Sequence, residues 1–122
     1  MSATNFSAVV APDGFTGPVT GNVVSSSVNI GSGGALTYVK KAAVTVDPAS
    51  ISAGAVNEET VTVSGAVAGD LVIVSPPAAI EASVCVVGAY VSASNTVKLR
   101  LYNPTGAPID PASGSWVFGL VR

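Results

Sequence analysis

Few side chains in this 122-residue chain could carry out chemistry, and their spacing does not bring them together. The chain has no histidine, which removes the commonest general base, the Ser-His-Asp and Cys-His nucleophile systems and Cys/His zinc sites. Aspartates remain as candidates for paired-carboxylate catalysis, but each is next to glycine or proline, a composition typical of turns. They are Asp13, Asp47, Asp70 and Asp110. We therefore expect turn roles for these aspartates.

Other motifs with possible chemistry are also incomplete. Glu58 and Glu59 are adjacent, so in an extended segment they would point to opposite faces and could not act on one bond. The D-x-D-x-D-G pattern of a calcium loop is absent. The glycine-rich stretch Gly31–Gly34 lacks the lysine and the following helix of a phosphate-binding loop. We predict a protein without enzyme activity, metal or cofactor.

The charge content argues against nucleic acid as a partner. Charged residues make up 10% of the chain, against about 25% in typical globular proteins, and the net charge is −2. The basic residues form no run longer than two: they are Lys40, Lys41, Lys98, Arg100 and Arg122. Such a distribution cannot neutralise a row of phosphates.

Targeting and membrane signals are likewise missing from the given sequence. The first residues, MSATNFSAVVAPDG, contain no basic region, and the apolar cluster at residues 7–11 is too short for a signal peptide. No segment approaches the roughly 20 apolar residues of a membrane span. We expect a protein made in the cytoplasm that does not enter a membrane. The single cysteine, Cys85, lies among valines and is expected to be a buried small hydrophobic residue.

The hydrophobic pattern is that of an all-β protein, because no window has helical periodicity. Strict alternation predicts strands at residues 60–64, 96–101 and 115–121. The tight turn at Ala93–Asn95 should join the second of these to the preceding strand as a hairpin. The side chains expected to point into the core from the last two strands are Val97, Leu99, Leu101, Trp116, Phe118 and Leu120.

Two further strands are expected at residues 71–74 and 83–92. Both are apolar on both faces, so each should be covered on both sides, and the second should be the most buried strand of the fold. Turns are expected at residues 103–106 and 110–114. The tetrapeptide Asp-Pro-Ala-Ser occurs at residues 47–50 and again at 110–113, which we interpret as a reused turn.

The first part of the chain is less regular because glycines interrupt it. Only short strand candidates remain there, at residues 19–24, 27–30, 36–39 and 43–46. The sequence therefore predicts an extended glycine-rich N-terminal arm, residues 1–35, and a compact β domain, residues 36–122. Several short strands separated by turns favour an antiparallel β-sandwich or a small β-barrel.

The β domain resembles a module of tailed-bacteriophage virion proteins over roughly residues 44–122. The similarity is carried by Val61-Thr-Val-Ser-Gly-Ala66, Gly69-Asp-Leu-Val-Ile-Val-Ser-Pro-Pro-Ala78, Gly88-Ala-Tyr-Val-Ser-Ala-Ser-Asn-Thr-Val97, Arg100-Leu-Tyr-Asn-Pro-Thr-Gly106, Ile109-Asp-Pro-Ala-Ser-Gly114 and Trp116. Such modules are found among small head-decoration, or capsid cement, proteins and head-fibre proteins. The resemblance implies a structural protein on the outer surface of the virion's capsid, with the major capsid protein as its partner.

A homo-oligomer is also expected. A β surface poor in charge and rich in valine and alanine tends to aggregate unless identical subunits cover it. The resemblance favours a trimer, since such modules usually sit on three-fold or quasi-three-fold axes. The alternative function is a head-fibre or tail-associated adhesion module that binds host glycans. Its candidate stacking residues are Tyr90, Tyr102 and Trp116, although the alternation of Trp116 with Phe118 and Leu120 predicts a core position for Trp116.

The stretch FTGPVTGNVV, residues 15–24, contains Thr-Gly-x-Val twice and resembles the Thr-Gly-Asn-Val repeats of phage fibre proteins. Its glycines permit close approach to another backbone, and its proline holds the chain extended and cannot donate to a β ladder. We expect this stretch to order against a neighbouring subunit or the capsid. The predicted contact residues are Phe15, Thr16, Gly17, Pro18, Val19, Thr20, Gly21, Asn22, Val23 and Val24.

Overall fold

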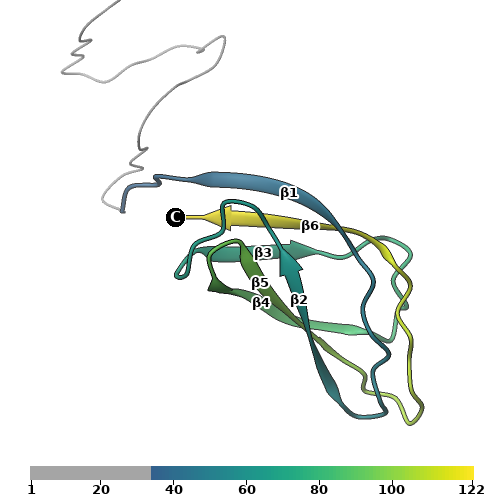
Figure 1. Cartoon of the computed structure of the whole chain (residues 1–122). Coiled ribbons are helices and arrows are strands. Elements are labelled where there is room, and N and C mark those ends of the chain that lie inside the picture. The colour runs from purple at the N-terminus through teal and green to yellow at the C-terminus, as the bar shows by residue number, and fades with distance from the viewer. Residues whose placement is uncertain (1–33) are drawn as a thin grey trace, which may run out of the picture.

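Two three-stranded antiparallel sheets form the part of the chain that the computed structural model describes, residues 34–122 (Figure 1). There is no helix in this range. The strands are β1 (Val39–Val46), β2 (Val56–Thr62), β3 (Leu71–Ser75), β4 (Cys85–Ala93), β5 (Thr96–Tyr102) and β6 (Gly114–Val121). The predicted all-β class is confirmed, and the arrangement is sandwich-like. Nearly all of the predicted arm, residues 1–35, lies outside the described residues.

Each sheet has a central strand that pairs with both of its neighbours. The order in one sheet is β1-β6-β3 and in the other β2-β5-β4, so β6 and β5 are central. The side chains that we expected to point inward from these two strands are fully buried: Val97, Leu99, Leu101, Trp116, Phe118 and Leu120. The predicted hairpin of β4 and β5 is confirmed, and Asn95 in its turn has a left-handed φ of 59°. The strict alternation of β5 and β6 thus indicated the core correctly.

The strand β3 is not covered on both sides, which corrects the expectation from its four consecutive apolar residues. It is an edge strand, paired only with β6. Its inward side chains, Val72 and Val74, pack against the core. Leu71 and Ile73 point away from the other sheet and are 62% and 60% exposed.

The expectation that residues 83–92 form the most buried strand is also wrong. β4 is an edge strand, and a β-bulge between Val86 and Gly88 inserts one extra residue. Because strand side chains alternate with period two, the inserted residue moves the side chains after it to the opposite face, as far as a second register shift between Val91 and Ala93. Ala89, after the bulge, packs against the core, whereas Cys85, before it, is exposed instead of buried.

The two copies of Asp-Pro-Ala-Ser lie beside each other at one end of the molecule. Ile51, which follows the first copy, and Ile109, which precedes the second, form an antiparallel bridge with N–H···O distances of 2.7 and 3.0 Å. Beside this bridge, the buried amide of Asn103 donates to the carbonyls of Ile51 and Ala107 at 3.0 and 2.8 Å. Its oxygen accepts the backbone N–H of Thr105 at 2.9 Å. One side chain therefore holds the loops before β2 and after β5 together.

An arginine ties together the opposite end. Arg122 donates two hydrogen bonds to the buried carboxylate of Asp70, at 2.6 and 2.8 Å, and a third to the Gly65 carbonyl. Its guanidinium also lies over the Tyr38 ring, 4.7 Å from the centroid. Asp70 accepts the backbone N–H of Val67 as well, so its expected turn role is confirmed, but the ion pair was not foreseen. Figure 1 shows the end marked C beside the beginning of β1.

Replacing Asn103 by alanine should lower the free energy of unfolding by about 2 kcal/mol, because a buried amide that bonds to Ile51, Ala107 and Thr105 would be lost at once. Urea titration followed by tryptophan fluorescence measures this change, since Trp116 is in the core. Asn57→Ala is the control, because the half-buried Asn57 amide bonds chiefly to the Glu59 side chain, at 2.5 Å, and only at 3.4 Å to a backbone carbonyl, that of the exposed Ala49. Equal losses in both variants would contradict the role assigned to Asn103.

Replacing Asp70 by asparagine should flatten the acid dependence of stability. The Arg122 guanidinium holds the pKa of the Asp70 carboxyl below its ordinary value of about 3.8, so the ion pair stabilises the fold above that pH. The stabilisation disappears as the pH falls through the lowered pKa, because protonated Asp70 no longer attracts Arg122. The unfolding midpoints of the native chain and Asp70→Asn should differ at neutral pH and converge in strong acid. Asp47→Asn is the control and should keep the native acid dependence.

Candidate functional site

The carboxylates of the described residues are dispersed and do not form a catalytic pair in a cleft. Glu58 and Glu59 point to opposite faces of β2, as predicted, and Glu59 accepts the Ala49 N–H at 2.7 Å. Asp47 and Asp110 lie in connections between strands. Among residues 34–122 no group of three or more His, Cys, Asp or Glu side chains could hold a metal ion. The features that could support function are therefore surfaces, and the two outer sheet faces differ strongly.

The outer face of the β2-β5-β4 sheet is the more polar one: its charges pair with one another, although Val56 and Val87 on this sheet are each 58% exposed. Glu58 accepts a hydrogen bond from Arg100 at 2.7 Å and lies 3.7 Å from Lys98. Lys98 also donates to the Thr60 hydroxyl at 2.7 Å. The Arg100 guanidinium stacks over the Tyr90 ring at 4.9 Å and, through its hydrogen bond, holds the pKa of the Glu58 carboxyl below its usual range. This face is suited to contact with water.

The outer face of the β1-β6-β3 sheet is apolar; we call it the apolar face. The strand register places its side chains in three rows that run across β1, β6 and β3 in turn. The rows are Val39, Val121 and Leu71; Lys41, Gly119 and Ile73; and Ala43, Val117 and Ser75. Lys41 is the only charged residue of the nine. An uncovered sheet face of this composition indicates a contact surface.

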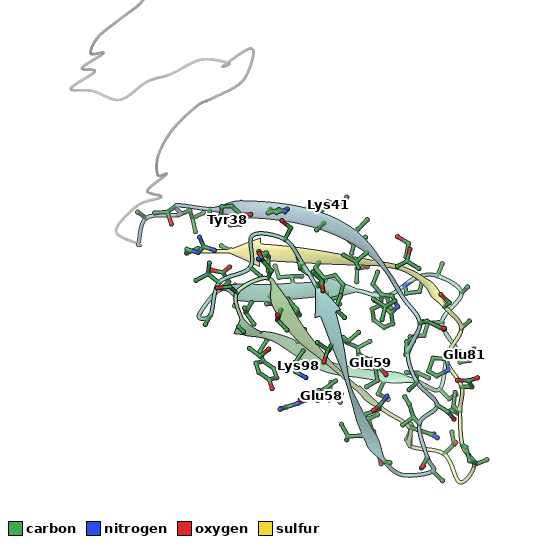
Figure 2. The ribbon with its side chains drawn as sticks, viewed as in Figure 1. Tyr38, Lys41, Glu58, Glu59, Glu81 and Lys98 are labelled. Carbon is green, nitrogen blue, oxygen red and sulfur yellow. The ribbon has the colours of Figure 1, made fainter. Side chains whose placement is uncertain are left out.

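A hollow of about 300 Å³ lies in the middle of the apolar face. Its floor is the backbone of β6 at Gly119, because glycine places no side chain between Lys41 and Ile73 on the neighbouring strands. Lys41 stands at the β1 side, and Figure 2 shows its side chain directed away from the rest of the molecule. None of the carboxylates of residues 34–122 forms a salt bridge with Lys41. The hollow is therefore an apolar pocket beside a single positive charge, that of Lys41.

Sequence reasoning missed this surface for a specific reason. The run Leu71–Val74 was interpreted as a strand covered on both sides within one chain. In the structure only the inner side of this strand is covered. Its outer side chains, Leu71 and Ile73, form part of the apolar face. The run is apolar on both faces, a pattern typical of a strand that is covered on each side. The pattern alone could not show that β3 lies at a sheet edge with one face exposed.

The predicted site residues have different outcomes. The proposed contact stretch, residues 15–24, lies outside the described residues, so its role stays a prediction. Of the three candidate stacking residues, Trp116 is fully buried in the core, as its alternation predicted. Tyr102 is half-buried, and Tyr90 is 40% exposed on the polar face.

Residues 34–122 include no helix of the length and apolar character that would cross a membrane. Comparison with known proteins identified no relative: no protein-family model matches the chain, and neither a curated protein nor a solved structure matches it.

Proposed function

We propose that this protein is a capsid decoration, or cement, protein of a tailed bacteriophage. Its copies bind the outer surface of the head across neighbouring major capsid subunits and resist the pressure of the packaged DNA. It acts through buried contact area, without catalysis, cofactor or nucleic acid. The sequence resemblance over residues 44–122 supports the proposed family. The apolar face supports the proposed association of copies.

The observation that carries this proposal is the difference between the two outer faces. One face pairs its charges internally through Glu58, Lys98 and Arg100, while the other exposes Leu71 and Ile73. A protein with one solvated and one apolar face is suited to an assembly in which one side is covered. We propose that copies associate through the apolar face as a homotrimer, which then presents several identical capsid contacts. Many copies, each with modest affinity, can bind a lattice of repeated sites firmly.

A second candidate, a head-fibre or tail-associated adhesion module, has one observation in its favour. Tyr90 is exposed and its ring is stacked with Arg100, an arrangement that can also stack against a sugar ring. Arg100 covers one side of the Tyr90 ring, so a sugar could stack only on the other side. Arg100 also bonds to Glu58, which leaves it fewer N–H groups for a glycan. The decoration function is preferred because it also accounts for the apolar face.

Association of the full-length chain should depend on Ile73. Sedimentation equilibrium at micromolar concentration should give the mass of three chains, and Ile73→Gln should shift the equilibrium toward single chains because it places a polar amide in the apolar face. Val56→Gln is the matched control: Val56 is 58% exposed, close to Ile73 at 60%, but lies on the other sheet. A native chain that is monomeric, or equal effects of both substitutions, would contradict association through this face.

Binding to the capsid is the direct test of the proposed function. Expanded heads of the encoding phage, assembled without this protein, should bind it at regularly repeated positions and resist heat better than bare heads. Electron microscopy of the decorated heads and a thermal disruption assay measure the two effects. Negligible occupancy together with unchanged heat resistance would reject the decoration function. Binding to host glycans in place of heads would favour the adhesion module.

A further inference from the structure

The size of the apolar face limits what can cover it. Three strands about 4.8 Å apart and five residues of about 3.3 Å each give an area of roughly 14 by 17 Å, or about 240 Å². A stable interface between two folded proteins usually buries about 800 Å² on each partner. The face alone is therefore too small for packing one rigid β domain against another. Its dimensions fit an extended segment that crosses it.

The charge of the face disfavours simple self-pairing and indicates the composition of the covering segment. Its one charged residue is Lys41, so two faces packed against each other would supply neither lysine with a counter-charge. A covering segment should be apolar and should carry one carboxylate. Residues 1–33 of this chain have that composition: Asp13 is their only charged residue, and valines and phenylalanines lie on both sides of it.

We infer that the apolar face binds the N-terminal segment of a neighbouring copy, with Asp13 paired to Lys41 and Phe15 seated in the hollow over Gly119. In an extended segment, residues two apart point to the same side and lie about 6.6 Å from each other. Lys41 and Gly119 are direct partners on adjacent strands, about 4.8 Å apart at the backbone, and the long lysine side chain can extend the distance between the charge and the hollow to match. The inference rests on the proposed function in one respect, since it names the partner of the face through which copies associate.

The way in which the chain enters the sheet favours a neighbouring copy over the same chain. The N–H of Thr37 donates to the Arg122 carbonyl at 2.7 Å, and the N–H of Arg122 donates to the Tyr38 carbonyl at 3.0 Å. These bonds extend the β1–β6 ladder beyond Val39, so the chain enters along the plane of the sheet. Its own preceding residues would have to reverse direction to cross the apolar face. The segment of a neighbouring copy needs no such reversal.

Disulfide trapping in the full-length chain tests the inference. Phe15→Cys is combined with Gly119→Cys, and the exposed Cys85 is replaced by serine to prevent other disulfides. Mild oxidation should produce covalent oligomers on a non-reducing gel, because a disulfide requires Cα atoms within about 7 Å. The matched control pairs Phe6→Cys with Gly119→Cys and should cross-link at least about fivefold less. A cross-link confined to single chains would overturn the neighbouring-copy assignment, and no preferred cross-link would overturn the site.

A charge exchange tests the Asp13–Lys41 pair in the same assay. Asp13→Lys and Lys41→Asp should each reduce the cross-link yield by about two- to fivefold, as expected for a partly exposed ion pair. The two substitutions together should restore most of the yield, because the pair is re-formed with reversed charges. Independent, additive losses would show that the two residues do not meet.

Filling the hollow provides a variant that should not disturb the fold. A Cβ placed on Gly119 would lie 3.6 Å from the Ile73 Cβ, an ordinary contact, and valine is well suited to a strand. Gly119→Val should unfold at the native midpoint when both chains are diluted to single chains, but should lose oligomers in sedimentation equilibrium at micromolar concentration. Retained oligomers would overturn the seating of Phe15 in the hollow.

The inference and the proposed function can fail separately. Cross-linked oligomers that do not bind heads would leave the inference standing and reject the decoration function. If the chain binds heads but gives no preferred cross-link, the decoration function stands and the inference about the N-terminal segment is rejected.

Discussion

The packing of β5 against β6 across the sandwich is the constraint on which the rest of the structure depends. Each is the central strand of its sheet, and the six inward side chains of these two strands are fully buried. The four other strands are edge strands within the described range: β2 and β4 pair with β5, and β1 and β3 pair with β6. Loss of the contact between the central strands would therefore leave both sheets without a covered face.

The outward side chains of the same two central strands decide the character of the surface. β5 presents Lys98 and Arg100 to the outside, and both interact with Glu58 on β2. β6 presents Val117, Gly119 and Val121, among which only glycine leaves room for a hollow. One outer face is thus neutralised within the chain, whereas the other remains apolar. This difference between the two outer faces is the observation on which the proposed association of copies rests.

Two polar clusters connect the ends of the sandwich and tie its stability to its surface. Asn103 joins loops that are far apart in the sequence, because its buried amide donates to the carbonyls of Ile51 and Ala107 and accepts the N–H of Thr105. Arg122 joins Asp70, Gly65 and Tyr38 at the end where the chain enters β1. That cluster holds the start of β1 beside the apolar face. The course of residues 37–39 at the start of β1 therefore follows from an ion pair and a short extension of the β1–β6 ladder.

The sequence by itself determined the all-β class, the core residues of β5 and β6, the β4–β5 hairpin and the turn role of Asp70, because period-two alternation and turn composition are local signals. Only the tertiary structure decided which strands lie at sheet edges, since strand order depends on pairing between distant segments. β4 is an edge strand with one outer face, which leaves Cys85 exposed, and the bulge at Val87 changes the alternation after it; an isolated glycine at position 88 was the local sign of that bulge. The Asp70–Arg122 pair and the apolar face likewise emerged from strand register, which places residues far apart in the chain side by side.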